Sequence, residues 1–400
     1  MKKILMITAL MLVLCMMPLA LFSCNGGTEP TEAPTEAPTE APTDKPKETD
    51  PPLVGTNIPL LGNEAKFKIN GRYMTTREGI SCDNVGSGIE FCGTMKGKVY
   101  VEIRSKGDDS YYTVFVDGVR QEERIRIANS RFSETVEIAD LGETEGEHHI
   151  RIVKQTEARY ATADFRSITI DGELGERPAD RDLYIEFVGS SLTCGMGNMG
   201  WPEMGVSQSQ CALPEEGTQG MAFLTAEAMG ADCSILGVSG MGLAKTWFPP
   251  LTLESYYKAT SYYRDQTVEY DFSTARVPDI IVLNVGKNDG QLSGSLTPST
   301  DGEFTTAARK ILSLIREKYG DEVPVVWAYD LYDAHRMALI EPILEELGGE
   351  ESGYYVCKVT SNRLGGDYHT DLAGHKQASE DLLALFAEKD YFGLDVEIGQ

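Results

Sequence analysis

The chain has 400 residues, of which 62 are acidic and 36 are basic, and its formal net charge at pH 7 is −26. No basic cluster occurs along it, and phosphate binding needs grouped lysine and arginine side chains, so a nucleic-acid partner is excluded. The length is enough for two domains that each have a core.

Residues 1–24 have the plan of a secretory signal. Two lysines precede a nearly continuous apolar run, residues 4–22, and Ser23 and Cys24 follow it. A cysteine in that place resembles a bacterial lipoprotein signal, in which the cysteine is lipidated and becomes the new N-terminus. The resemblance implies an extracellular protein, anchored through Cys24 to the membrane at the bacterial cell surface. A plain signal peptide with an incidental cysteine is the alternative.

Residues 25–54 form a linker rich in proline, threonine and glutamate. Proline recurs every four residues from Pro30 to Pro46, and the segment lacks the apolar side chains that a core requires. Such composition predicts a disordered or polyproline-like tether between the anchor and the folded part.

Residues 55–172 are predicted to be all-β. Short runs alternate between apolar and polar side chains, and glycine, aspartate and asparagine separate them. The runs are residues 98–105, 111–118, 131–138, 148–155 and 165–172. Short strands at nearly regular spacing predict a β-sandwich or jelly-roll domain.

Residues 181–395 change in character and predict an α/β domain. Strands rich in valine and isoleucine, without clean alternation, are typical of strands covered on both faces. They are residues 184–189, 233–240, 279–286, 324–330 and 354–360, with helices between them at 218–229, 304–318, 339–347 and 373–389. This order predicts a doubly wound parallel sheet, with its chemistry at the carboxyl ends of the strands. The long segment 241–277 interrupts the order and is expected to form part of the site.

Polar residues follow these strands at the positions where a site would form. They are Ser190 and Ser191, then Ser239 and Gly240, then Lys287, Asn288 and Asp289, and finally Asp367 and His369. A nucleophile, hydrogen-bond donors and a base would thus meet at one edge of the sheet. Acyl transfer needs this set of groups.

Four segments resemble the conserved blocks of the SGNH (GDSL) hydrolases, in the same chain order: GSSLTCG, VSGMG, GKND and DYHTDLAGH. Three further segments, YTVFVDG, HHIRIVKQTEAR and FRSITIDG, resemble the N-terminal β domain of carbohydrate esterase family two. The resemblance covers about residues 60 to 390. It implies an SGNH-type parallel sheet flanked by helices, preceded by an all-β jelly-roll or sandwich domain.

Members of that family remove acetyl groups from xylan, glucomannan and related plant polysaccharides. The resemblance therefore implies a serine esterase that forms an acetyl-serine intermediate and acts on an acetylated polysaccharide or oligosaccharide. It implies neither a metal nor an organic cofactor, and we expect a monomer. Two alternatives stay open. One is an esterase for other acyl esters, such as peptidoglycan acetate or short-chain esters. The other is a non-catalytic carbohydrate-binding lipoprotein of the cell surface.

The resemblance also assigns catalytic residues. The family's serine comes two residues after a glycine, so Ser191 is the nucleophile, and Ser190 stands where the family usually has aspartate. His369 matches the base. The superfamily often places an aspartate three residues before this histidine, but here Asp367 lies two before it. Either the Asp367 carboxylate or a backbone carbonyl would then orient His369.

Three donors are implied for the oxyanion: the backbone N–H groups of Ser191 and Gly240 and the side-chain amide of Asn288. Lys287 stands where the family often has threonine, and we expect its side chain to point away into solvent. Asp289 is expected to brace its loop. These roles follow from the resemblance.

Three aromatic residues, Trp247, Tyr262 and Tyr368, are candidates for stacking on a sugar ring, with ordinary core packing as the alternative. Six cysteines remain after the signal segment, and none forms a CxxC motif, so the sequence predicts neither a zinc site nor a redox site. Pairing of Cys82 with Cys92, or of Cys194 with Cys211, stays open.

Overall fold

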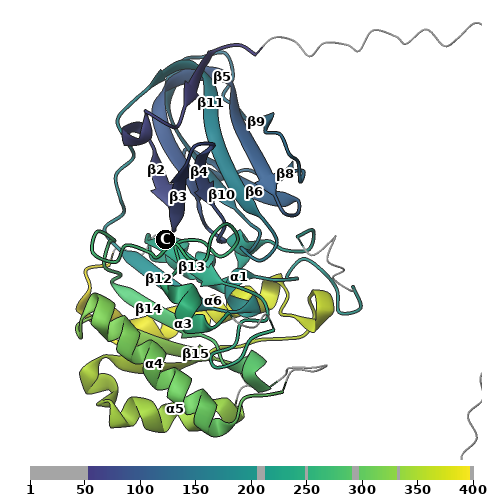
Figure 1. Cartoon of the computed structure of the whole chain (residues 1–400). Coiled ribbons are helices and arrows are strands. Elements are labelled where there is room, and N and C mark those ends of the chain that lie inside the picture. Colours follow the sequence, from purple (N-terminus) through teal and green to yellow (C-terminus); the bar gives the residue numbers. More distant parts are fainter. Residues whose placement is uncertain (1–52, 205–211, 248–250, 291–296, 331–333, 397–400) are drawn as a thin grey trace, which may run out of the picture. The chain divides into compact units, whose positions relative to one another are not determined.

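The computed structural model describes residues 53–204, 212–247, 251–290, 297–330 and 334–396. The predicted signal segment 1–24, its Cys24, and nearly all of the linker 25–54 lie outside these ranges. Residues 52–400 form one compact unit, in which an N-terminal β part precedes an α/β part (Figure 1). None of the helices in the described ranges has the length and apolar character needed to cross a bilayer.

The β part is an antiparallel sheet of eleven strands. The long strand β5 pairs with β9, β10 and β11. Side chains alternate between the two faces of the sheet, and those on one face form a core that contains Ile89, Phe91 and Ile150. The finer expectation of a jelly roll or sandwich stays a prediction. The strands are β1 (Thr56–Pro59), β2 (Lys68–Asn70), β3 (Tyr73–Thr76), β4 (Gly79–Cys82), β5 (Gly88–Lys106), β6 (Ser110–Val116), β7 (Val119–Arg120), β8 (Ile125–Ile127), β9 (Glu134–Asp140), β10 (Gly146–Lys154) and β11 (Thr162–Leu174).

The α/β part contains a five-stranded parallel sheet in the order β13-β12-β14-β15-β16. The strands are β12 (Tyr184–Gly189), β13 (Asp232–Gly237), β14 (Ile280–Asn284), β15 (Val325–Tyr329) and β16 (Tyr354–Lys358). All five lie within the predicted runs or start one residue before them. Every residue of β14 is buried, as expected of a strand covered on both faces.

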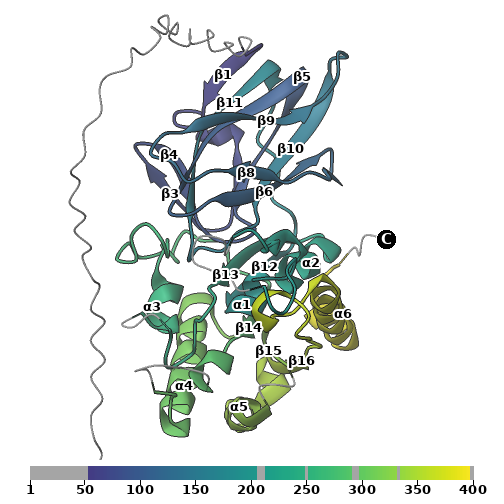
Figure 2. The same ribbon diagram turned by 90° about the vertical axis from the view of Figure 1, so that its right-hand side faces the viewer.

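Helices cover both faces of this sheet (Figure 2). On one face, α4 (Asp301–Tyr319) and α5 (Ala334–Glu346) pack on a cluster that contains Leu283 and Trp327. On the other, α2 (Met221–Ala228) and α6 (Leu372–Glu388) pack on a cluster that contains Phe187 and Val282. The sequence did not predict the short helices α1 (Ser191–Cys194) and α3 (Leu253–Lys258).

The segment 241–277 has a different role from the one predicted. No described residue of it lines the cavity that contains Ser191. Instead it contacts the β part: Ser261 Oγ and the Tyr263 N–H donate to the Asp83 carboxylate over 2.6 and 2.8 Å. Arg264 makes two hydrogen bonds to Asp164 of strand β11, of 2.5 and 2.6 Å. This segment therefore joins the two parts of the fold.

A buried ion pair fixes the β part to the strand that leads to Ser191. Arg72, between β2 and β3, lies 3.2 Å from the Glu186 carboxylate of β12, and both side chains are fully buried. The Arg72 guanidinium also donates to the backbone carbonyls of Tyr257 and Ala259 and lies 3.9 Å from the centre of the Tyr270 ring. The Tyr257 hydroxyl donates to the other Glu186 oxygen over 2.6 Å. The two parts thus share one polar network.

Candidate active site

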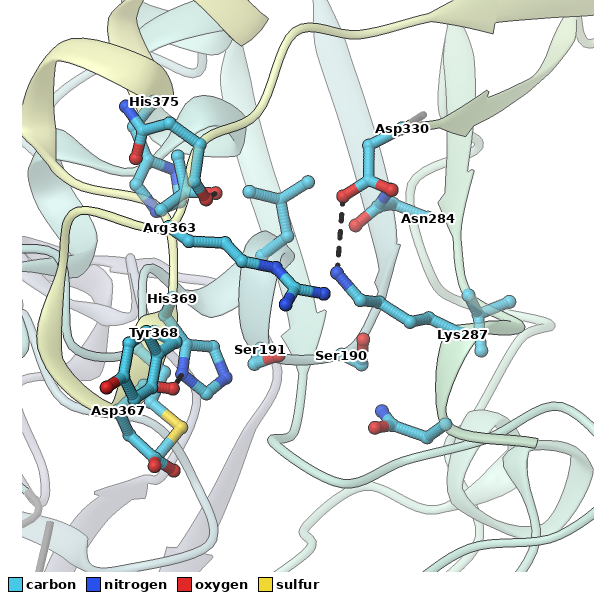
Figure 3. A pocket seen from close by; sticks show the side chains of 16 residues that line it. Ser190, Ser191, Asn284, Lys287, Asp330, Arg363, Asp367, Tyr368, His369 and His375 are labelled. Atoms are coloured by element: carbon cyan, nitrogen blue, oxygen red, sulfur yellow. Dashed lines mark hydrogen bonds and ion pairs between the residues drawn. The ribbon is translucent and has the colours of Figure 1, made fainter. Parts of the chain in front are cut away.

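A cavity of about 230 Å³ lies beyond the carboxyl ends of the parallel strands. Ser191, His369, Asn288 and Asp367 line it, together with Tyr368. Figure 3 shows the imidazole ring of His369 pointing toward Ser191. The structure thus gathers residues that are far apart in sequence around one small polar space.

Ser191 is placed by a sharp turn directly after β12. It is the first residue of helix α1, and Ser190, which is buried, precedes the helix with φ of −125° and ψ of −143°. Gly189 allows this turn, because a Cβ atom there would lie 2.1 Å from Thr193 Oγ1 and 2.4 Å from the Asn284 carbonyl oxygen. A side chain at residue 189 would therefore displace the turn that carries Ser191.

His369 is held by backbone carbonyls. Its Nδ1 atom lies 3.2 Å from the Gly366 oxygen and 3.1 Å from the Asp367 backbone oxygen. Carbonyl oxygens only accept hydrogen bonds, so Nδ1 must carry the proton and Nε2 is left as the basic nitrogen. The left-handed conformation of Asp367 and Tyr368, with φ of 51° and 57°, aims this loop at the ring.

The sequence named the Asp367 carboxylate first as the group that orients His369, but the structure gives this carboxylate a smaller part. Its side chain is exposed, and the hydrogen bonds to His369 come from the backbone, which is the alternative that the sequence left open. Asp367 still acts on the ring through its charge, which opposes the lowering of the His369 pKa.

We expect Asp367→Asn to reduce kcat/KM by less than about tenfold, because the backbone hydrogen bonds fix the tautomer without the carboxylate. Loss of an orienting aspartate in a full triad costs about 10⁴-fold in kcat. Steady-state hydrolysis of 4-nitrophenyl acetate measures the difference. A loss near that larger figure would show that Asp367 orients the ring through its side chain.

The environment of His369 keeps its imidazole neutral. Burial lowers the pKa of His369 below its ordinary value, and the nearby Lys287 ammonium adds to this effect, although Asp367 and the two carbonyl groups oppose it. A neutral imidazole can accept the proton of a serine hydroxyl.

This direction predicts the acid limb of the pH profile. A base works in its unprotonated form, so activity falls as pH drops through the pKa of His369. We expect the midpoint of this limb in kcat/KM to lie below about pH 6.5, the ordinary pKa of histidine. Initial rates on a soluble acetyl ester across this range measure it, and a midpoint above pH 7 would contradict the assignment of the base.

The predicted oxyanion donors lie in two loops beside Ser191. Asn288 lines the cavity, and its Nδ2 donates to the Met241 carbonyl oxygen over 2.9 Å, which leaves the second amide hydrogen of that nitrogen for a substrate. Gly240 has φ of 85°, in the region that favours glycine, and it is not among the described residues that line the cavity. Asp289 accepts from the N–H groups of Leu243, Ala244 and Lys245, as expected of a residue that braces its loop.

Lys287 does not point away into solvent, which corrects the expectation from sequence. Its side chain lines the cavity, and its Nζ lies 3.3 Å from a carboxylate oxygen of the buried Asp330. The Arg363 side chain enters the same cavity (Figure 3). Sequence reasoning missed Asp330 and Arg363, although Asp330 is the last residue of the predicted strand 324–330 and follows strand β15, where site residues are expected.

The three aromatic candidates have different surroundings. Tyr368 lines the cavity and is 56% exposed, so its ring is accessible to a ligand. Trp247 is 38% exposed, and its backbone N–H donates to the Gly240 carbonyl oxygen. Tyr262 packs edge-on against Tyr256 with ring centroids 5.5 Å apart, which is the core-packing alternative.

His375 and the cysteines have structural positions. The buried His375 ring accepts a hydrogen bond from the Met221 N–H through Nδ1, and burial lowers its pKa to about 4. Cys82, Cys92, Cys194, Cys233 and Cys357 are free thiols. Cys82 and Cys92 are thus not paired, which settles one possibility that the sequence left open, and Cys211 lies outside the described residues.

Comparison with known proteins adds to this geometry. Residues 69–178 match the family described as Carbohydrate esterase 2 N-terminal. The chain is 29% identical over 339 residues to the cellulase/esterase CelE of Acetivibrio thermocellus, an alignment that covers 80% of this chain and 39% of that protein. It is 28% identical over 148 residues to an acetylxylan esterase / glucomannan deacetylase of Cellvibrio japonicus, covering 36% of this chain and 40% of that protein. The matches thus span about two fifths of each relative.

The fold is shared with a solved structure of a family two carbohydrate esterase from Clostridium thermocellum in complex with cellohexaose. The TM-score is 0.71 at 25% sequence identity, and the match covers 82% of this chain and 99% of that chain. Because the shared region includes both the β part and the α/β part, the likeness extends beyond the segment matched by the family. Residues 69–178 thus match the model of the N-terminal domain of carbohydrate esterase family two, and about four fifths of the chain is similar to a solved esterase of that family.

Proposed function

We propose that the protein is a serine esterase that removes O-acetyl groups from plant polysaccharides such as xylan or glucomannan. The observation that carries this proposal is the placement of Ser191 and His369 on one cavity, with the His369 tautomer set by backbone carbonyls. The esterase names of the relatives in Acetivibrio thermocellus and Cellvibrio japonicus support the same reaction class.

The reaction proceeds in two steps. His369 Nε2 takes the proton of Ser191 Oγ as this oxygen attacks the acetyl carbonyl carbon, and the carbonyl oxygen becomes an oxyanion. The N–H groups of Ser191 and Gly240 and the Asn288 amide are the proposed donors to that oxyanion. The tetrahedral intermediate then collapses, and the imidazolium gives its proton to the sugar oxygen as it leaves.

Water completes the cycle. It attacks the carbonyl carbon of acetyl-Ser191 while His369 Nε2 takes its proton, and a second tetrahedral intermediate forms. Collapse of this intermediate releases acetate, and the imidazolium returns its proton to Ser191 Oγ. Every proton is therefore taken and returned by the same nitrogen, the one that the backbone carbonyls leave without a hydrogen.

The polar character of the cavity supports a sugar as the alcohol part of the ester. Lys287 and Asp330 are an ion pair at its wall, and charged side chains of this kind donate to and accept from several hydroxyl groups. The exposed ring of Tyr368 provides a flat apolar face at the same place. A long acyl chain would find little apolar surface there, which favours acetate as the acyl group.

The test is release of acetate from defined polymers. Acetylated glucomannan and acetylated xylan are incubated with the protein beside acetylated peptidoglycan and 4-nitrophenyl butyrate, with Ser191→Ala as the control. We expect acetate from the plant polymers and little hydrolysis of the butyrate. Deacetylation of peptidoglycan alone would favour the alternative esterase, and glycan binding without any acetate release would favour a non-catalytic carbohydrate-binding protein.

We also propose that a lipid on Cys24 anchors the protein at the bacterial cell surface, with residues 25–54 as a tether. The positive start, the apolar run and the cysteine that ends it support this proposal. Incorporation of a labelled fatty acid into the expressed chain, and its loss in Cys24→Ala, is the expected result. Labelling that persists in the variant would contradict it.

A further inference from the structure

Three titratable side chains meet beneath the nucleophile, at the junction of the two parts. Glu157 follows β10 in the β part, whereas Cys194 and Glu215 belong to the α/β part. All three are fully buried, and one ligand atom from each lies within 4.8 Å of the other two. None is among the described residues that line the cavity, so substrate would not touch them.

Each glutamate uses one oxygen to hold a loop. Glu157 Oε2 accepts from the Ser239 N–H over 2.6 Å, and Glu215 Oε1 accepts from the Glu157 N–H over 3.1 Å. Cys194, below Ser191, places its sulfur 3.6 Å from Ser239 Oγ. The group is therefore connected to the Ser239–Gly240 turn and to the helical turn that begins at Ser191.

The second oxygen of each glutamate has no hydrogen-bond partner within the part of the chain that the structure describes. Glu157 Oε1 and Glu215 Oε2 are buried without a hydrogen bond. A buried carboxylate oxygen left unpaired costs several kcal/mol in general. A proton on one of the two carboxyl groups, a water molecule or a cation would each reduce this cost, and one carboxylate oxygen of each glutamate lies within 4.8 Å of the other.

The surrounding charges favour a proton. The cations that face the pair are Lys154 and Arg159, and Tyr262 is the neighbouring phenol. The Lys154 ammonium donates to the backbone oxygens of Asp83 and Thr156 and not to either carboxylate. Arg159 donates to the Ser239 carbonyl oxygen over 3.4 Å. Ionisation of one buried carboxyl group opposes ionisation of the other when the two lie within 4.8 Å, because water screens their repulsion poorly there.

We propose that Glu157 and Glu215 share one proton and that this acid pair positions the Ser239–Gly240 turn beside Ser191. Both are positioning residues, since they act through the backbone of the turn. The positioning role rests on the proposed esterase function, whereas the shared proton does not. The β part thereby contributes to the site from below, through a residue that substrate never meets.

The pair makes stability depend on pH. Burial raises the pKa of both carboxyl groups, and the charge of Glu157 raises that of Glu215 further. A group with a raised pKa in the folded state contributes stability below its unfolded pKa, and this contribution is lost as pH rises through the folded pKa. The melting temperature of the wild-type protein should therefore fall as pH rises above the ordinary pKa of glutamate, about 4.3.

Glu215→Gln tests the shared proton. The amide oxygen can still accept from the Glu157 N–H, and the NH₂ group takes the place of the second carboxylate oxygen but does not titrate. We expect a flatter dependence of melting temperature on pH, and loss of the infrared carbonyl stretch of a buried carboxylic acid. The exposed Glu143→Gln is the control and should behave as the wild type does. An unchanged slope together with an unchanged infrared band would overturn the shared proton.

Glu157 variants test the positioning role. Glu157→Gln keeps an acceptor for the Ser239 N–H and should retain kcat within about threefold, whereas Glu157→Ala removes it and should lower kcat by about 10- to 100-fold with KM nearly unchanged. Equal kcat in both variants would overturn this role. Elemental analysis of the purified protein completes the test. A stoichiometric metal that is present in the wild type and lost in Glu215→Gln would show that a cation, and not a proton, is bound by the two glutamates, and would overturn the shared proton. If no ester is hydrolysed, the proposed function fails while the infrared result still decides the proton.

Discussion

Ser191→Ala should lower kcat for acetyl ester hydrolysis by at least about 10³-fold, because the Ser191 hydroxyl is the one toward which the His369 ring points in the cavity. Residual activity would come from the remaining donors and from substrate binding. Initial rates on 4-nitrophenyl acetate measure the loss. The mass of the intact protein during turnover measures acetylation, which should be absent from the variant.

Ser190→Ala is the matched control. Ser190 is the adjacent residue and also lines the cavity, but it precedes helix α1, while Ser191 is the first residue within it. Its removal should change kcat by less than about tenfold. An inactive Ser190→Ala together with an active Ser191→Ala would move the nucleophile to the first serine and overturn the site geometry described above.

The pattern of the sequence was sufficient for the strands of the parallel sheet. The run 279–286 has consecutive apolar residues from Ile280 to Leu283 and is too short for a typical helix, and strand β14 within it is buried throughout, as expected of a strand covered on both faces. The short edge strands β2 and β3 escaped prediction because three or four residues carry too little alternation. Helix α1 escaped because its four residues form a single turn, whose position depends on the close packing at Gly189.

The site was predictable where a side chain does the chemistry and not where the backbone does. Ser191 and His369 could be predicted because the segments that contain them, GSSLTCG and DYHTDLAGH, resemble two conserved blocks of the SGNH hydrolases. The orientation of His369 depends on two carbonyl oxygens, and every residue has one, so no residue type marks them. The conformation of Asp367 and Tyr368 that aims these oxygens arises from the tertiary fold, since tyrosine rarely adopts positive φ.

The sequence analysis also did not predict which charged side chains are buried. Arg72 lies in a short polar segment, Asn70-Gly71-Arg72, that reads as an exposed turn, yet its side chain is fully buried. Glu157 and Glu215 likewise occur in segments that resemble surface loops. Burial of such groups depends on partners more than fifty residues away in the chain, such as Glu186 for Arg72, and local composition carries no information on them.

Arg72→Ala should lower the free energy of unfolding by about 3–5 kcal/mol, because it leaves the Glu186 carboxylate buried without its cation. The carbonyl oxygens of Tyr257 and Ala259 would lose their donor as well. Urea unfolding followed by circular dichroism measures the change. Since Glu186 belongs to the strand that ends at Ser191, loss of activity should accompany loss of structure over the same range of urea.

A double substitution separates the charge from the packing. Arg72→Met with Glu186→Gln removes both charges and keeps most of the side-chain volume, so it should be more stable than Arg72→Ala, since no uncompensated charge stays buried. The exposed pair of Arg309 and Glu346, 2.6 Å apart, is the control, and Arg309→Ala should unfold as the wild type does. If Arg72→Ala were no less stable than Arg309→Ala, the buried pair would not be what joins the β part to the catalytic strand.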